Sequence, residues 1–301
     1  MFAVTILGNN SAIPAYDRHP TAQVVTLFDQ HILIDCGEGT QIQLAKYKMR
    51  KSKINHIFIS HLHGDHYFGL IGLLTSMGLV GRTNDLHLYA PAALEKIIQL
   101  QLSVADTVLP YQLIFHAIQQ EGLIADTNKF TVECFATKHR VECWGFVIRE
   151  KKDPRKIDKE KIKLFDIPAA YYNALKKGAD YETKEGNIIK NDLVTIENTI
   201  AKSYAYSADT IYDESLIEKV QHVSLLYHEA TYLKGLEELA LKRFHSTTIQ
   251  AATIALKAKV DKLIVGHFSS KYEHLEDFLT ETKTVFANCE LAMEGVTYLI
   301  K

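Results

Sequence analysis

One ten-residue segment constrains this chain more than any other, because it places three histidines and an aspartate within six residues. It reads IFISHLHGDH and runs from Ile57 to His66. Its apolar, β-branched start predicts a buried strand, and the apolar run that follows it predicts a helix. In an extended segment His61 and His63 project to the same side. Imidazole and carboxylate, here with Asp65, are the ligands that zinc and similar divalent metals prefer, so the pattern predicts a metal-binding loop.

The four ligand groups of this loop allow two arrangements. They could complete one closed structural site, or they could be divided between two ions that take further ligands from elsewhere in the chain. A polar loop whose histidines satisfy only local hydrogen bonds is the ordinary interpretation of a single histidine. That interpretation does not account for four potential ligands between two apolar runs.

Composition restricts the class of protein. The 301 residues are 47% hydrophobic and 23% charged, which is typical of a globular protein with one large domain or two small ones. The net charge of -2 means that any nucleic acid must be bound by a local basic patch. The longest apolar run, Gly69 to Gly81, is short and interrupted, and Met1 to Leu7 reads as a strand rather than a signal peptide. We therefore expect a cytoplasmic protein without membrane association.

Cysteine usage points in the same direction. The four cysteines are scattered and form no C-x-x-C pair, which predicts buried free thiols in a reducing compartment. They are Cys36, Cys134, Cys143 and Cys289.

The order of the expected elements predicts an α/β fold with sheet-on-sheet packing and helices outside, because strands alternate with helices in one part and follow one another in another. Strands are expected at 2–7, 23–28, 31–35, 57–59, 85–89, 112–118, 129–138, 144–150, 202–207, 222–228 and 260–265. Helices are expected from 40 to about 48, and at about 68–77, 92–102, 248–258 and 273–285, with Pro91 opening the third and Ser246 or Thr247 capping the fourth.

The composition changes at Glu150. Glu150 to Leu164 holds seven Lys or Arg against four Asp or Glu and almost no periodic apolar face. We interpret residues 150–200 as an arm inserted into the main body. On composition alone, a solvated surface insertion is the ordinary interpretation of such a segment.

Three later predicted strands end in a potential ligand, namely His139, Asp209 and His267. Each one alone is weak evidence, because polar residues are common at strand ends and turns. With the first loop they make seven ligands. One zinc site uses about four ligands, so seven fit two ions that share an aspartate and a bridging water.

The H-x-H-x-D-H loop, followed in order by His139, Asp209 and His267, resembles the metallo-β-lactamase superfamily. More narrowly, the chain resembles the short form of ribonuclease Z, the tRNA 3′-processing endoribonuclease family, over almost its whole length. The ligand set specifies only the superfamily, whereas the His-Glu-Ala-Thr and His-Ser-Thr motifs and the arm narrow it to the family. The further matching motifs are Leu7-Gly8 with Pro14, the stretch from Leu33 to Gln41, His228-Glu229-Ala230-Thr231, His245-Ser246-Thr247 and Gly266-His267.

The resemblance implies a single metallo-β-lactamase-like domain over 1–301, an αββα sandwich with a protruding exosite arm at 150–200. It implies a zinc-dependent endoribonuclease that cleaves the 3′ trailer from tRNA precursors and leaves a 3′-hydroxyl on the tRNA. Two zinc ions per subunit would clamp the attacking and leaving oxygens and lower the pKa of bound water to roughly 7. By the resemblance, one zinc is held by His61, His63 and His139, the other by Asp65, His66 and His267, and Asp209 bridges them.

The resemblance also assigns catalytic roles. Asp65 would orient or deprotonate the attacking water, and the pair Glu229 and His245 would protonate the leaving 3′-oxygen. The structural alternative is that Glu229 is a helix-start carboxylate and that His245 merely precedes an N-cap. The arm would grip the precursor tRNA by its phosphates, and in a homodimer one subunit's arm would serve the other's active site. The candidate phosphate contacts are Lys151, Lys152, Arg155, Lys156, Lys159, Lys161 and Lys163.

The chain departs from the family pattern at three places. The arm reads Ile167 to Tyr171 where the family has a Gly-Pro-rich turn, Arg18-His19 stands where Arg-Asn is usual, and Ala208 stands where Gly is usual.

Three other functions compete with this prediction. The first competitor is a small-molecule phosphodiesterase of the same superfamily. The second is an RNA-binding scaffold without metals, against which the complete ligand set argues. A flavodiiron-type redox role would need a flavin-binding domain, which does not follow here.

Overall fold

Residues 1–301 are all described by the computed structural model, and they divide into two units. The main unit comprises Met1–Thr127, Thr131–Arg149 and Lys202–Lys301. The second unit, called the insert below, comprises Asn128–Phe130 and Glu150–Ala201. None of the helices combines the length and apolar character needed to cross a bilayer.

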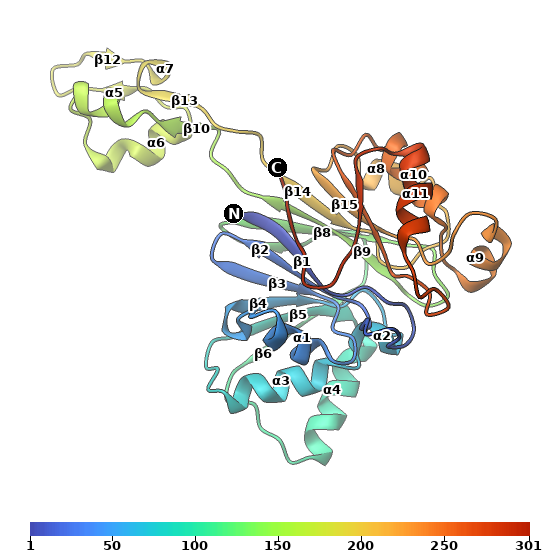
Figure 1. The fold of residues 1–301 in the computed structure, drawn as a ribbon. Helices are drawn as coiled ribbons and strands as arrows, with labels where there is room; N and C mark the ends of the chain where they lie inside the picture. The colour runs from blue at the N-terminus through green and yellow to red at the C-terminus, as the bar shows by residue number, and fades with distance from the viewer. The chain divides into compact units, whose positions relative to one another are not determined.

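The first sheet of the main unit has seven strands in the order β18-β1-β2-β3-β4-β5-β6. β1, β2 and β3 pair antiparallel, whereas β3 to β6 are all parallel neighbours, so their carboxyl ends meet at one edge. Helices α1, α3 and α4 cover its outer face (Figure 1). The strands are β1 (Phe2–Gly8), β2 (Ala22–Leu27), β3 (Gln30–Ile34), β4 (Ile54–Phe58), β5 (Leu86–Pro91), β6 (Leu113–Ile118) and β18 (Thr297–Leu299).

The second sheet also has seven strands, in the order β17-β16-β15-β14-β9-β8-β7. β14, β15, β16 and β17 run parallel, and β9 joins β14 antiparallel. Helices α8, α10 and α11 lie on its outer side (Figure 1). The strands are β7 (Gly122–Asp126), β8 (Phe130–Ala136), β9 (Trp144–Glu150), β14 (Ser203–Tyr206), β15 (Leu225–Glu229), β16 (Leu263–Gly266) and β17 (Cys289–Leu291).

The helices of the main unit bury one face each. In α10 the buried residues include Ala251, Ala252 and Ala255, whose small side chains let the helix lie close to the sheet. The helices are α1 (Thr40–Lys46), α2 (Gly64–Tyr67), α3 (Leu70–Leu79), α4 (Ala93–Val104), α8 (Leu216–Lys219), α9 (Glu237–Arg243), α10 (Thr248–Lys257) and α11 (Glu276–Val285), with a 3-10 turn η1 (Lys51–Lys53).

The inner faces of the two sheets pack against each other. The Phe58 ring on β4 lies 5.4 Å from the Phe146 ring on β9, and the Tyr204 hydroxyl on β14 bonds the Gln23 side chain on β2. Two facing sheets with helices outside confirm the predicted metallo-β-lactamase-like αββα sandwich.

Several local predictions are confirmed and a few are wrong. Thr247 caps α10 in a full capping box with Gln250, as the sequence indicates. All four cysteines are free and buried, as expected. Pro91, however, ends β5 instead of opening α4, which begins at Ala93. The short strands β7, β17 and β18 and the helix α9 were not predicted, because three to seven residues give too little periodicity.

The insert has a small apolar core of its own, which its composition does not indicate. Tyr181 and Val194 are buried there together with Ile162, Ile167 and Leu175. β10 pairs antiparallel with β13, and β11 with β12. Its elements are β10 (Arg155–Ile157), α5 (Lys159–Leu164), η2 (Ala169–Tyr171), α6 (Tyr172–Lys176), β11 (Tyr181–Glu182), β12 (Ile188–Ile189), α7 (Asn191–Val194) and β13 (Thr195–Glu197).

Candidate metal centre

The site lies at the carboxyl ends of strands from both sheets. β4 ends at Phe58, and the next residues carry the H-x-H-x-D-H motif into α2. β8, β14 and β16 end just before His139, Asp209 and His267. Because parallel strands end at the same edge of a sheet, ligands that are up to 206 positions apart in the chain converge (His61 to His267).

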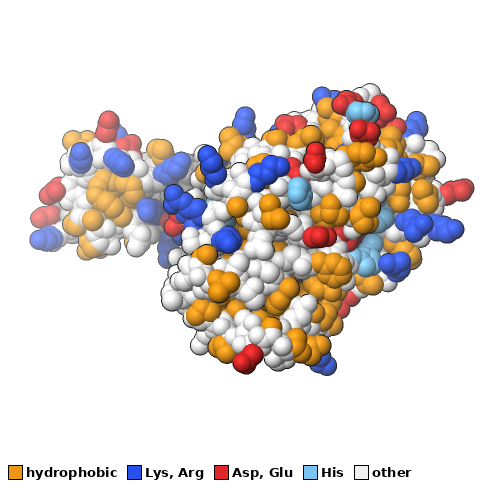
Figure 2. Space-filling model, turned by 60° about the horizontal axis from the view of Figure 1, so that its bottom comes forward, with side chains coloured by type: hydrophobic (Ala, Val, Ile, Leu, Met, Phe, Trp, Pro, Cys, Tyr) orange, Lys and Arg blue, Asp and Glu red, His pale blue; other side chains and the backbone are white.

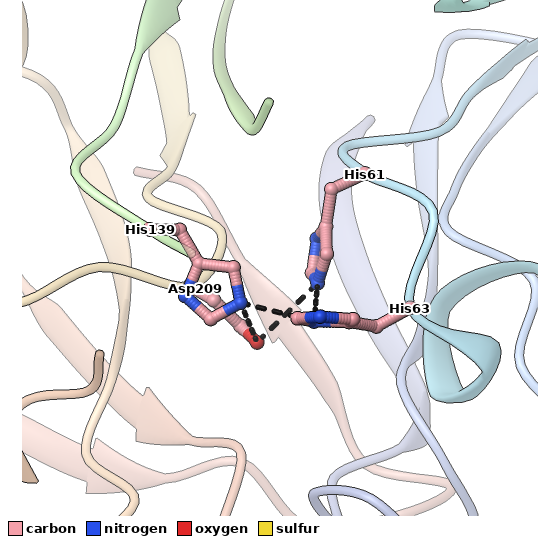
Figure 3. A group of neighbouring side chains, drawn as sticks. All are labelled: His61, His63, His139 and Asp209. Carbon is pink, nitrogen blue, oxygen red and sulfur yellow. Dashed lines mark hydrogen bonds and ion pairs between the residues drawn. The ribbon is translucent and has the colours of Figure 1, made fainter. Parts of the chain in front are cut away.

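The first ligand group consists of three histidines and one aspartate (Figure 3). His61 Nε2 and His139 Nε2 each lie 3.0 Å from His63 Nδ1. Asp209 Oδ2 lies 3.6 Å from His61 Nε2 and 3.8 Å from His139 Nε2. Nitrogen and oxygen atoms that converge in this way surround a point where one cation fits.

The second group adjoins the first through Asp209. His66 Nε2 lies 3.3 Å from His267 Nε2. Asp65 Oδ2 lies 3.6 Å from His66 Nε2 and 3.5 Å from His267 Nε2. Asp209 Oδ2 is 3.4 Å from His66 Nε2, and Asp209 Oδ1 is 3.3 Å from His267 Nε2. The structure therefore brings all seven sequence-predicted ligands together, with Asp209 touching both groups.

Burial and charge make this centre suitable for cations. Burial, then the neighbouring His66, lowers the pKa of His61 well below its usual value, which favours the neutral imidazole that metals require. Burial also acts against protonation of His66, but Asp209, Asp65 and Asp35 outweigh it and raise its pKa. Asp209 Oδ1 is buried and accepts no hydrogen bond. An acceptor of this kind, beside carboxylates that stabilise positive charge, fits a divalent metal ion.

Asp35, at the end of β3, orients ligands of both groups and was missed by the sequence analysis. Its Oδ2 accepts hydrogen bonds from His66 Nδ1 at 2.7 Å, from the Ser60 hydroxyl at 2.8 Å and from the Tyr206 hydroxyl at 2.7 Å. The Ser60 hydroxyl in turn lies 3.0 Å from His61 Nδ1. These contacts set the ring orientations so that both Nε2 atoms face the centre. The only sequence sign of this role is an aspartate at a strand end.

Two other ligands are oriented in the same manner. His139 Nδ1 lies 2.9 Å from the carbonyl oxygen of Phe244, and His267 Nδ1 lies 2.9 Å from the Thr231 hydroxyl. Neither Phe244 nor Thr231 was predicted to take part. A ring whose Nδ1 is engaged in this way presents Nε2 to a metal.

The predicted pair Glu229 and His245 lies beside the ligands. His245 Nδ1 is 2.8 Å from Glu229 Oε1 and 4.0 Å from Asp209 Oδ2. Glu229 is fully buried and accepts hydrogen bonds from the Thr210 and Thr231 backbone N–H groups at 3.1 Å and from the Thr231 hydroxyl at 2.7 Å. A fixed carboxylate therefore orients an imidazole next to the centre, which is an arrangement suited to proton transfer.

Backbone conformation contributes to the geometry. Asp35, Ala208 and His267 all have φ between 54° and 61°, and each follows the end of a strand at the site. Such left-handed residues are uncommon outside glycine and gather at functional sites. They let the chain turn sharply so that the side chains at these positions reach the centre.

The centre opens into a cleft of about 780 Å³. Six of the predicted site residues line it, namely His63, Asp65, His139, Asp209, His245 and His267. His61 and His66 lie beneath them and are fully buried. The cleft gives an outside molecule access to both ligand groups and to the His245 ring.

Comparison with known proteins finds relatives and solved structures that match almost the whole chain. A ribonuclease Z of Bacteroides thetaiotaomicron is 40% identical over 301 residues, which cover 99% of this chain and 95% of that protein. The short form of human tRNase Z has the same fold with a TM-score of 0.74 and 25% identity, covering 99% of both chains. A metallo-beta-lactamase fold protein of Bacillus subtilis has a TM-score of 0.69 at 20% identity, over 99% of this chain and 98% of that one.

A family model described as Anti-Pycsar protein Apyc1 matches residues 2–153. The match covers the H-x-H-x-D-H loop and His139. It ends before Asp209, the Glu229 and His245 pair, and His267, and before almost all of the insert.

Proposed function

Because the chain belongs to the ribonuclease Z family, we propose that it cleaves the 3′ trailer from tRNA precursors, using two zinc ions in the centre described above. The enzyme is a metal-dependent phosphodiester hydrolase. The observation that carries the proposal is the meeting of six candidate ligand side chains around a seventh, Asp209, beside the Glu229 and His245 pair and open to one cleft.

The residues divide into two ligand sets. His61, His63 and His139 would hold one ion, Asp65, His66 and His267 the other, and Asp209 would bridge them. When bound, two divalent ions supply charge for the attacking and leaving oxygens of a phosphodiester and lower the pKa of a bound water. Zinc is commonly bound by imidazole and carboxylate ligands, which makes it the metal that we propose.

The chain's own groups manage the protons. Asp65 Oδ2 accepts a hydrogen bond of 2.8 Å from the Ala12 backbone N–H, so its carboxylate is held still at the cleft, where it can orient the attacking water. His245, held by Glu229, would donate a proton to the 3′-oxygen as it leaves. That transfer leaves a 3′-hydroxyl on the tRNA.

The insert would grip the tRNA away from the cleaved bond. Lys152 pairs with Glu150 at 2.6 Å, and Arg155 bonds the Thr195 hydroxyl, so these two cations are already engaged. The exposed lysines of the insert remain as candidates for phosphate contacts that add affinity without sequence reading. They include Lys156, Lys159, Lys161 and Lys163.

A homodimer is part of the proposal. Large apolar side chains are exposed at the end of α3, on α4 and in the loop after it, and such surfaces mark interaction sites. Leu79 is 88% exposed and Val108 is 88% exposed. Light scattering at increasing protein concentration should give twice the chain mass, and Leu100→Lys with Val104→Lys on α4 should return the monomer mass.

The function is tested by incubating purified protein with a 3′-extended tRNA, with and without a chelator, and mapping the cut. We expect one cut at the tRNA 3′ end that is lost with the chelator and restored by zinc. His63→Ala should lose both metal and cleavage, whereas the exposed His274→Ala should lose neither. Full cleavage in protein stripped of divalent ions would refute the proposal.

A further inference from the structure

Cations line the cleft outside the metal centre. Arg140, Lys242, Arg243 and Lys271 are all exposed at its rim, and Glu38 is the one carboxylate of the lining that is not a candidate ligand. Figure 2 shows histidine side chains in pale blue with Lys and Arg side chains beside them on the main unit. The rim therefore carries an excess of positive charge next to a site that acts on phosphodiesters.

Arg140 is the cation next to the ligands. It follows His139 directly, and its Nη2 lies 3.1 Å from His63 Nε2, on the outer edge of the ring whose Nδ1 faces the other ligands. The guanidinium therefore stands at the mouth of the centre. A phosphate that reaches the metal ligands comes within the reach of this side chain.

Lys242 and Arg243 lie on the same wall as Arg140. They are the last two residues of α9, and the following residue, Phe244, turns the chain with a φ of 62°. The Phe244 carbonyl oxygen bonds His139 Nδ1 at 2.9 Å, which ties the end of α9 to the loop that carries Arg140. We call Arg140, Lys242 and Arg243 the cationic wall.

The wall is available for an external anion. None of its three side chains forms an ion pair with a carboxylate of the chain, whereas Lys138, two residues before Arg140, is paired with Asp213 at 3.1 Å. Unpaired cations along one wall of a cleft fit the backbone of a single-stranded nucleic acid, whose charges repeat along the strand. A guanidinium can also bind one phosphate through two parallel hydrogen bonds.

We propose that the cationic wall binds the RNA strand beside the cleaved bond, with Arg140 on the phosphate next to the metal centre and Lys242 and Arg243 on phosphates further along. This inference rests on the proposed function, and it adds the path of the strand through the cleft. The wall would bind phosphate rather than bases, so it positions any sequence equally.

The test measures cleavage of a 3′-extended tRNA by Arg140→Gln and by Lys242→Gln/Arg243→Gln at several salt concentrations. We expect KM to rise about tenfold in each variant. The slope of log KM against log salt should become shallower by about 0.7 for each phosphate that the variant no longer binds. Arg140→Lys should recover part of the affinity, and metal content should match that of the wild type. The matched control is Lys283→Gln, an exposed lysine of α11 outside the cleft, which should behave as the wild type.

The outcomes separate this inference from the function. If the wild type cleaves the tRNA and the wall variants keep its KM and salt slope, the inference is wrong and the function stands. If the wild type does not cleave, the function is wrong. RNA binding by the cationic wall is then measured by fluorescence anisotropy with a single-stranded RNA oligonucleotide. Equal affinities of the wild type and the triple Gln variant would refute the proposal that the wall binds RNA.

Discussion

At the scale of single residues, Asp209 depends on the backbone conformation just before it. Ala208 has a φ of 54° and is buried, and it stands where the resemblance to ribonuclease Z leads one to expect glycine. A residue with a Cβ is strained in the left-handed region by about 1 kcal/mol. The chain therefore holds Asp209, the proposed bridging carboxylate, with a strained backbone.

Replacing Ala208 by glycine should relieve this strain. We expect Ala208→Gly to raise the free energy of unfolding by up to about 1 kcal/mol. The gain is smaller than the strain relieved, because glycine also gives the unfolded chain more conformational entropy. Urea unfolding followed by fluorescence measures the change. The matched control is Ala205→Gly, at a buried alanine in β14 with ordinary strand geometry, which should destabilise. Destabilisation by both variants would show that Ala208 is not strained.

The proton donor role proposed for His245 predicts a pH dependence. Burial acts against the charged ring, but Glu229, Asp209 and Asp65 outweigh it and raise the pKa of His245 to about 9. A general acid works in its protonated form, so cleavage should decline as pH rises through the pKa of His245, which bound metal cations would lower from its metal-free value. Glu229→Gln should move the decline to lower pH, because it removes the carboxylate that most favours the imidazolium.

A pH–rate profile on the tRNA substrate measures this shift. The control is Glu214→Gln, an exposed carboxylate that pairs with Lys257. If the rate of Glu229→Gln declined at the same alkaline pH as that of the wild type, this would contradict the donor role of His245.

At the scale of elements, three histidines stack across β4, β5 and β6 on the inner face of the first sheet. His56 and His87 have ring centroids 5.0 Å apart, and those of His87 and His116 are 5.2 Å apart. His87 Nδ1 lies 2.9 Å from His116 Nε2. Burial, with added repulsion from His87 and His116, lowers the pKa of His56 to about 4.

This stack should make the fold sensitive to acid. The ordinary pKa of histidine is 6.5, so His56 is protonated below that pH in the unfolded chain. In the folded chain His56 becomes protonated only near pH 4. Stability is therefore lost as pH falls from about 6.5 to about 4, by on the order of 2 kcal/mol at pH 5. His56→Phe should lose less stability than the wild type between pH 7 and pH 5 in urea unfolding. The control His274→Phe, at an exposed position, should lose as much stability over this pH range as the wild type. If His56→Phe also loses as much stability as the wild type, the stack does not cause the acid sensitivity.

At the scale of the whole molecule, the insert can be removed without leaving distant chain ends. The Pro154 carbonyl oxygen accepts a 2.9 Å hydrogen bond from the Asn198 backbone N–H, and the Asp153 carbonyl oxygen accepts one from its side chain. The two ends of a deletion of residues 155–197 are thus adjacent, and a two-glycine linker can join them.

Deleting the insert in this way should weaken tRNA cleavage far more than hydrolysis of a small phosphodiester. The metal centre belongs to the main unit, which has its own cores, whereas the exposed lysines of the insert would hold tRNA. Parallel assays on the two substrates measure the ratio. A triple variant with Gln in place of Lys159, Lys161 and Lys163 should also weaken tRNA cleavage. The matching triple Lys→Arg variant, which keeps the charge, should not. Equal loss on both substrates would argue against a tRNA-binding role for the insert.

The sequence by itself determined the features that depend on neighbours a few positions away. The strand before His61, the Thr247 cap of α10, the alternation of elements and the ligand types at strand ends could all be predicted, because periodicity and caps are local. The set of seven ligands could be proposed from strand ends, but its division between two ions needed the resemblance to a family, since local signals do not relate His61 to His267.

Tertiary structure alone decided which groups orient the ligands and where the cations face. Asp35 reaches His66 across 31 positions, and the Phe244 carbonyl reaches His139 across 105. Asp35 meets His66 because β3 and β4 are neighbouring parallel strands of the first sheet. Phe244 meets His139 because β8 and β15, the strands that precede them in the chain, belong to the second sheet, and no pattern along the chain encodes either meeting. The same holds for the core of the insert, whose five buried side chains are spread over residues without a helical or strand period.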